Sequence, residues 1–71
     1  MSREEILFAS PLEPSDDPTD DQVDAAVANT LAELGEFGCA AVIAGAFARD
    51  PSRATARMRW ARRRTAGKKE E

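Results

Sequence analysis

Apolar residues recur at helical spacing between positions 20 and 34. Val23, Val27, Leu31 and Leu34 follow one another at intervals of four, four and three residues, which places them on one face of an amphipathic helix. Just before this stripe, Thr19 and the glutamine three residues later have the pattern of a capping box, and Gly35 suits the position after a helix end. The pattern predicts a first helix over 20–34.

A second helix is predicted over 39–49, where the chain carries no charge until its last residue. From Phe37 to Ala48 no residue is charged, and most are alanine, glycine or larger apolar residues. A helix that is apolar all round is usually buried on most sides, so the pattern indicates the central helix of a bundle. The alternative is a face for self-association. The uncharged stretch has twelve residues, whereas a membrane-spanning helix needs roughly 20.

A third helix is predicted over 51–66, because Asp50 suits the N-cap and Pro51 the first helical position. Its inward stripe is narrow and weakly apolar: Ala54, Met58, Ala61 and Thr65. Its outward stripe is basic and includes the single tryptophan: Arg53, Arg57, Trp60 and Arg64, flanked by Arg59, Arg62 and Arg63.

Residues 1–18 are predicted to form a disordered acidic tail, because prolines at positions 11, 14 and 18 interrupt regular structure. The exception is an apolar trio, Ile6, Leu7 and Phe8. These side chains either lie against the folded part or in solvent, or they form a short motif that docks on a partner. Residues 19–66 then make up the helical domain, and 67–71 a charged C-terminal tail.

The expected fold is all-α, a small three-helix unit with a thin core. Only ten large apolar side chains occur between residues 19 and 66. We therefore expect help from a second copy or a protein partner. The candidate interface residues are Ile6, Leu7, Phe8, Val42, Ile43 and Phe47.

Charge divides the chain into two halves. Residues 1–36 carry ten acids and one base, a net charge of −9, and residues 37–71 carry nine bases and three acids, a net charge of +6. One interpretation is that the basic third helix pairs with the acidic half. The other is that its arginines bind phosphate, since a planar guanidinium can bond two oxygens at once.

The composition excludes several classes of chemistry. There is no histidine and a single cysteine, Cys39, so a disulfide framework, a Cys/His zinc site and histidine-based acid–base catalysis are excluded. The aspartates of residues 16–24 lack the ligand order of an EF-hand loop. We expect a cytoplasmic protein that is not an enzyme, uses no metal or cofactor and does not contact membranes.

Ile43-Ala44, Phe47-Ala48, the turn Asp50-Pro51-Ser52 and an arginine-rich run ending at Arg64 follow one another in order. This order, over residues 43–65, resembles the helix-turn-helix in the promoter-reading C-terminal domain of bacterial sigma factors and related regulators. The sequence departs from that family at Ala48, where glycine is usual, and at 52–54, where the family has Gly-Thr-Val. The resemblance implies transcription regulation, with the third helix in the major groove of DNA.

The leading hypothesis is thus a small DNA- or nucleic-acid-binding regulator. The resemblance implies that Arg53, Arg57 and Arg59 lie nearest the bases. Trp60 can stack on a ligand or cover apolar surface. Phosphate contacts are expected from Arg62, Arg63, Arg64, Lys68 and Lys69. The alternative is a helical interaction module, a homodimer or a partner-binding protein, that acts through the second helix and the apolar trio.

Overall fold

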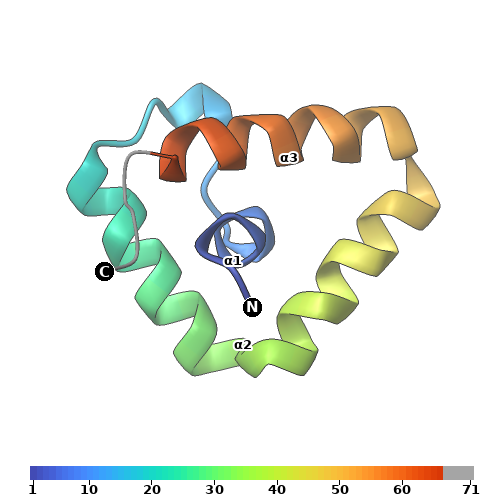
Figure 1. Cartoon of the computed structure of the whole chain (residues 1–71), viewed down its shortest axis with the longest axis horizontal. Coiled ribbons are helices and arrows are strands. Elements are labelled where there is room, and N and C mark those ends of the chain that lie inside the picture. The colour runs from blue at the N-terminus through green and yellow to red at the C-terminus, as the bar shows by residue number, and fades with distance from the viewer. Residues whose placement is uncertain (67–71) are drawn as a thin grey trace.

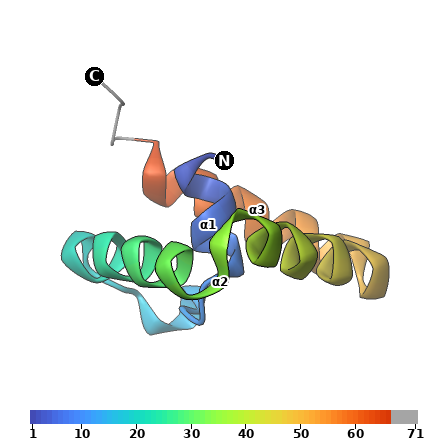
Figure 2. The same cartoon turned by 90° about the horizontal axis from the view of Figure 1, so that it is seen from below.

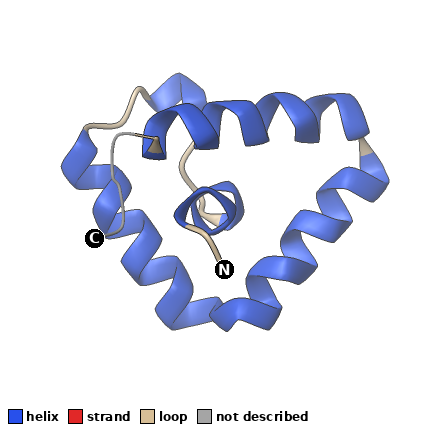
Figure 3. Ribbon diagram, in the orientation of Figure 1, coloured by secondary structure: helices blue, strands red, loops and turns tan. Residues whose placement is uncertain are grey.

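The computed structural model describes residues 1–66, and helices are the only regular secondary structure in that range. Its elements are helix α1 (Arg3–Ala9), a 3-10 turn η1 (Pro14–Asp16), helix α2 (Asp20–Arg49) and helix α3 (Pro51–Thr65), as Figure 3 shows. The expected all-α fold is confirmed. The charged tail predicted for residues 67–71, with Lys68 and Lys69, lies outside the described residues.

Helix α2 begins and bends where the sequence indicates. Thr19 Oγ1 accepts a hydrogen bond from the amide of Gln22 at 3.1 Å, and Gln22 Oε1 accepts one from the amide of Thr19 at 2.8 Å, so the capping box is formed. Gly35 has φ 68° and ψ 176°, a conformation that is accessible essentially to glycine alone. It divides α2 into two arms, residues 20–34 and 36–49. The second arm therefore begins three residues earlier than the predicted 39.

The two arms of α2 form a V, which α3 closes into a triangle (Figure 1). Helix α1 is seen end-on in the middle of that triangle. Figure 2, turned by 90°, shows α1 passing through this frame from one side to the other. The central helix of the fold is thus α1, which is only seven residues long.

The core forms around α1. Ile6, Leu7 and Phe8 are 4%, 0% and 2% exposed. The Phe8 ring stacks on that of Phe47 with 5.9 Å between the centroids. The remaining buried apolar residues come from the frame: Val23, Val27, Cys39, Ala54, Trp60 and Ala61.

The predicted disordered tail is therefore wrong for residues 3–9, and Ile6, Leu7 and Phe8 are core residues rather than a surface for a partner. Ile6, Leu7 and Phe8 pack against the apolar side chains on the inner side of the α2 bend and shield them from water. An ion pair to the frame and an N-terminal cap fix the start of α1. Arg3 pairs with Asp24 of the first α2 arm at 2.7 Å, and Ser2 caps α1 by accepting a hydrogen bond from the amide of Glu5.

The second arm of α2 is not the buried central helix that the sequence predicts. Cys39 is its one fully buried residue, while Ile43 and Phe47 are half-buried against the core. Phe37 is 93% exposed and Val42 is 38% exposed. The reason is the position of α1: it covers only the inner side of each arm, and the outer side of the second arm faces solvent.

The apolar stripe of the first arm is likewise only half buried. Val23 and Val27 face α1, whereas Leu31 and Leu34, close to the bend, are exposed. On α3, by contrast, the predicted inward stripe is confirmed. Ala54, Ala61 and Thr65 are buried and Met58 is half-buried.

Helix α2 is long and apolar enough, by length and composition, to cross a membrane. The bend at Gly35, however, divides this length between two arms that point in different directions. The uncharged part lies in the second arm, whose 14 residues span about 21 Å as a straight helix, against about 30 Å of hydrocarbon. As folded here, neither arm alone has the length of a straight span.

Candidate functional site

The arginines of α3 divide into paired and unpaired groups. Arg62 pairs with Glu4 at 3.2 Å, Arg64 with Asp20 at 3.2 Å and Arg57 with Glu13 at 3.4 Å. All three acids belong to the acidic half of the chain. The interpretation that the basic helix pairs with the acidic half therefore holds for these three arginines. The acid of each pair is at least partly open to solvent, so each pair contributes at most about 1 kcal/mol.

Arg57 fastens the segment after α1 to α3. Its Nε donates a hydrogen bond to the carbonyl oxygen of Phe8 at 2.9 Å, and its Nη2 donates to the carbonyls of Ser10 and Leu12 at 2.9 and 2.8 Å. The guanidinium also lies over the rings of Phe8 and Trp60, 5.5 and 5.1 Å from their centroids. Burial lowers the pKa of Arg57, and the nearby Glu13 carboxylate partly opposes this shift. With its donors used inside the protein, Arg57 has a structural role.

Trp60 is a core residue, which corrects the predicted outward stripe. Its side chain is 7% exposed, under the Arg57 guanidinium. The sequence pattern predicts an outward stripe because arginines surround the tryptophan in sequence. A long arginine side chain can, however, lie along apolar surface while its guanidinium reaches carbonyl oxygens, and Arg57 does this.

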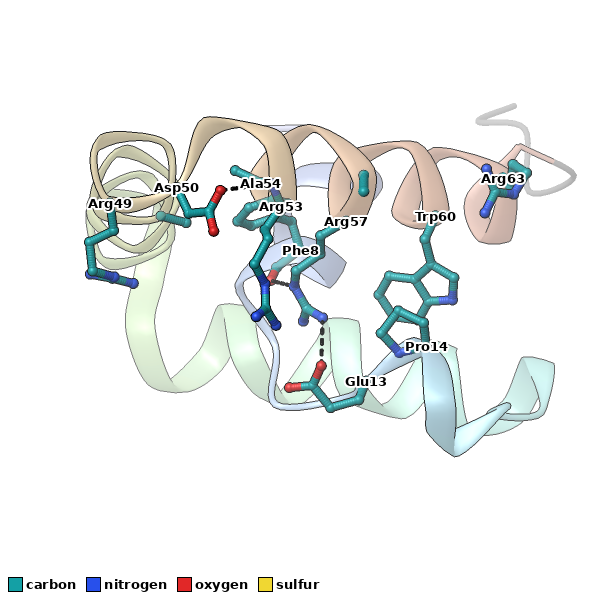
Figure 4. A pocket seen from close by; sticks show the side chains of 12 residues that line it. Phe8, Glu13, Pro14, Arg49, Asp50, Arg53, Ala54, Arg57, Trp60 and Arg63 are labelled. Atoms are coloured by element: carbon teal, nitrogen blue, oxygen red, sulfur yellow. Dashed lines mark hydrogen bonds and ion pairs between the residues drawn. The ribbon is translucent and has the colours of Figure 1, made fainter.

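A groove with a volume of about 700 Å³ opens beside α3 (Figure 4). Phe8 and Trp60 lie in its apolar lining. Its charged lining residues, which define what we call the basic groove, are Glu13, Arg49, Asp50, Arg53, Arg57 and Arg63. Figure 4 shows Arg49, Arg53 and Arg57 in a row, with their guanidinium ends turned to the side on which Glu13 lies.

The local sequence explains why these side chains meet. Asp50 caps α3 by accepting a hydrogen bond from the amide of Arg53 at 3.2 Å, so a single residue connects the two helices. Arg49 ends α2 and Arg53 lies in the first turn of α3, which brings them to the same end of the groove. One turn of helix separates Arg53 from Arg57.

The predicted nucleic-acid site is brought together only in part. Arg53, Arg57, Trp60 and Arg63 line the groove, of which Arg57 and Trp60 are held in the core. Three other predicted residues do not line it: Arg59, Arg62 and Arg64. Arg49 is not among the residues that the sequence predicts for the site; the signal that could have indicated it is its place at the start of the basic run, just before the turn at Asp50.

Four exposed arginines have no acidic partner within residues 1–66: Arg49, Arg53, Arg59 and Arg63. Their guanidinium groups keep their donors for a ligand. Arg59 lies on a part of α3 away from the groove, whereas the other three line it. The unpaired positive charge is thus concentrated around one concavity.

A second candidate surface lies on the outer side of the second α2 arm. Phe37, Val42 and the alanines at positions 40, 41, 44 and 48 are exposed there. Of the interface residues predicted on this helix, Val42 is on this surface, while Ile43 and Phe47 pack against the core instead. We call these exposed residues the outer face of α2.

The connection between α2 and α3 is shorter than the helix-turn-helix pattern requires. That motif joins its helices by a turn of about three or four residues. Here Pro51 and Ser52, which the resemblance places in the turn, are already helical, and Asp50 alone connects the helices.

Within residues 1–66 the structure contains no group of three or more histidine, cysteine, aspartate or glutamate side chains able to hold a metal ion. Cys39 is fully buried as a free thiol. Neither feature adds a reactive centre to the basic groove.

Comparison with known families, with curated proteins and with solved structures gives no match for this chain. The resemblance to the sigma-factor domain thus has no support outside the residues that suggested it. A function has to be argued from the two surfaces alone.

Proposed function

We propose that this chain is a small, non-enzymatic nucleic-acid-binding protein that contacts phosphates through arginines of α3 and of the end of α2. The observation that carries the proposal is the concentration around one groove of three guanidinium groups without an acidic partner in the described chain: Arg49, Arg53 and Arg63. Surface arginines that served solubility alone would not need to gather around one groove. Phosphate is the anion that a planar guanidinium fork fits best, together with carboxylate.

The contacts proposed here are to the backbone rather than to bases. Arg57, which the resemblance places near the bases, has its donors engaged with three carbonyl oxygens of the protein. Trp60, proposed to stack, is covered. Phosphate contacts position a nucleic acid without reading its sequence, so the protein would bind many sequences alike. A regulatory role would then depend on where the protein is brought, and it rests on the resemblance alone.

The experiment is a binding titration with DNA and RNA at two salt concentrations. Each phosphate contact releases counterions, so affinity should fall steeply as salt rises. A variant with Arg49, Arg53 and Arg63 all changed to Gln should lose binding and keep its helical circular dichroism. Absence of binding by the unmodified protein at low salt, or equal binding by this variant, would refute the proposed function.

A second candidate function, an interaction module, is favoured by the exposure of Phe37. A phenylalanine that is 93% exposed contributes little to the fold of one chain, and its neighbours on the outer face of α2 carry no charge. Contiguous exposed apolar surface of this kind is typical of protein–protein contacts. The partner would be a second copy or another protein.

Sedimentation at increasing protein concentration tests this second function. Phe37→Ala should leave the melting temperature of the monomer unchanged and reduce any association. Leu31→Ala is the matched control, because Leu31 is also exposed but lies on the other arm of α2. An unmodified protein that stays monomeric and captures no partner through Phe37 would rule the module out.

A further inference from the structure

The basic groove holds more positive charge than its own acids neutralise. Arg53 and Arg57 run side by side in Figure 4, with Arg49 next in the row. Of the two acidic lining residues, Asp50 is used as the N-cap of α3. The other, Glu13, meets Arg57 at 3.4 Å with a side chain that is 64% exposed. Like charges that share a concavity repel one another, so a bound anion would be favoured there.

From this arrangement we infer that the basic groove binds the phosphate backbone of single-stranded nucleic acid, with a phosphate taking the place of the Glu13 carboxylate. The inference rests on the proposed function and specifies its ligand. It also assigns a role to Glu13 as an internal counter-ion that the ligand displaces.

The shape of the site favours a single strand. A concavity of about 700 Å³ has the size of a site for a small molecule or a few nucleotides. A duplex read by α3 would instead need the convex face of that helix, as in a helix-turn-helix. Arg59 and Arg62 lie outside the groove, and Arg62 is paired with Glu4. Among the described residues, three arginines without an acidic partner line the groove, whereas one, Arg59, lies outside it.

Arg57 makes the displacement of Glu13 possible without loss of structure. Three backbone carbonyls hold its guanidinium, at 2.8 to 2.9 Å, independently of the carboxylate. When Glu13 leaves, the Nη1 atom that it contacted becomes available and the guanidinium stays in place. The groove therefore has a fixed positive group that needs no rearrangement on binding.

The absence of an open aromatic face in the groove predicts binding that does not depend on base identity. Most proteins that bind single strands add base stacking on aromatic rings to their charged groove. Here Phe8 and Trp60 line the groove but are 2% and 7% exposed, and the Arg57 guanidinium lies over both rings. With Arg49, Arg53 and Arg63 as phosphate contacts, and Arg57 a fourth once Glu13 is displaced, the logarithm of affinity should fall with that of salt at a slope of about −3.

The test is fluorescence anisotropy of the whole protein with labelled oligonucleotides of about eight nucleotides, a length within the site sizes of single-strand-binding folds. Arg53→Gln and Arg63→Gln should each weaken single-strand binding about tenfold, because each removes a charge-assisted hydrogen bond. Arg59→Gln is the matched control: it removes an arginine of the same helix that is also exposed and has no acidic partner in residues 1–66, and it should change affinity less than twofold. Circular dichroism melts verify that all three variants are folded.

Two further measurements test whether nucleic acid is the ligand of the groove and whether Glu13 is the counter-ion that it displaces. Glu13→Gln should strengthen single-strand binding several-fold, whereas Asp16→Asn, which removes a nearby acid that does not line the groove, should not. Equal effects of Arg53→Gln and Arg59→Gln, or tighter binding of a duplex than of its single strands, would overturn the inference while leaving the proposed function standing. Linear polyphosphate that binds as well as the oligonucleotide would overturn nucleic acid as the occupant. No binding of any oligonucleotide at low salt would overturn the proposed function itself.

Discussion

Arg57 donates a hydrogen bond from Nε to the carbonyl oxygen of Phe8, 49 residues earlier in the chain, at 2.9 Å. The same guanidinium lies above the Phe8 ring. This one side chain therefore joins α3 to the end of α1 through both a backbone bond and a ring contact. It connects the element that completes the core to the element that carries the basic groove.

Replacing Arg57 should destabilise the fold more than any other arginine of α3. Arg57→Ala leaves three carbonyl oxygens without their donor and uncovers Trp60, at a cost of about 3 kcal/mol. A chain of this length has a total stability on the order of 4–10 kcal/mol. Urea denaturation measures the change, and Arg59→Ala, within about 0.5 kcal/mol of the unmodified protein, is the control. Equal stability of the two variants would show that Arg57 does not fasten α1.

Leu7 should behave as a central core residue. It is completely buried although it lies near the start of the chain, and Leu7→Ala should cost about 2–5 kcal/mol. Thermal denaturation followed by circular dichroism is the measurement. Leu34→Ala, at an exposed leucine of α2, serves as the comparison and should change stability little. A Leu7→Ala protein as stable as Leu34→Ala would mean that α1 is not part of the core.

The bend of α2 gives a prediction with opposite signs at two glycines. Gly35→Ala places a side chain at φ 68° and should cost about 1–3 kcal/mol, even though no atom lies within 4 Å of the added Cβ. Gly45→Ala, inside the second arm, should stabilise the protein by about 0.5–1 kcal/mol. Its added Cβ meets only the flexible end of Arg49 at 3.3 Å. Denaturant midpoints measure both, and a stabilising Gly35→Ala would contradict the bend.

The capping box of α1 predicts a specific loss of stability in acid. Hydrogen bonds from the backbone and the side chain of Ser2 lower the pKa of Glu5 below its ordinary value of 4.5. A carboxyl group with a lowered pKa in the folded state stabilises the fold above pH 4.5, and this contribution is lost as the pH falls through the folded-state pKa.

Glu5→Gln keeps an acceptor for the Ser2 amide but cannot titrate. Between pH 6 and pH 3 the unmodified protein should therefore lose more stability than this variant, by under about 1 kcal/mol because the pair is exposed. Thermal melts across that range give the comparison. If the stability of both proteins falls equally between pH 6 and pH 3, the titration of Glu5 does not contribute to the stability of the fold.

Short-range signals made much of the frame predictable. The boundaries of the first α2 arm follow from Thr19 and Gly35, and the start of α3 follows from Asp50 and Pro51. Each of these residues acts on its own few neighbours. A capping box of the same kind was also present at Ser2 and Glu5, and it would have indicated α1 despite the prolines that follow.

These local signals do not predict the position of α1, nor which sides of α2 and α3 are buried. Burial of Phe8 depends on residues more than 35 positions later, such as Phe47 and Trp60. The basic groove was only half predicted for a related reason. Charge alone places Arg57 and Trp60 on the surface. The carbonyl oxygens of Phe8, Ser10 and Leu12 hold the Arg57 guanidinium instead, and Trp60 is buried beneath it; no helical pattern connects those carbonyls to α3.

The threading of α1 through the frame has a consequence for the timing of folding. Helix α1 is synthesised before the helices that enclose it, and several of the enclosing residues, from Cys39 to Ala61, follow it by 30 positions or more. Closing a loop of about 49 residues has to precede most of the burial that rewards it. The chain therefore cannot complete its core on the ribosome until α3 has emerged, and Ile6, Leu7 and Phe8 remain open to chaperones until then.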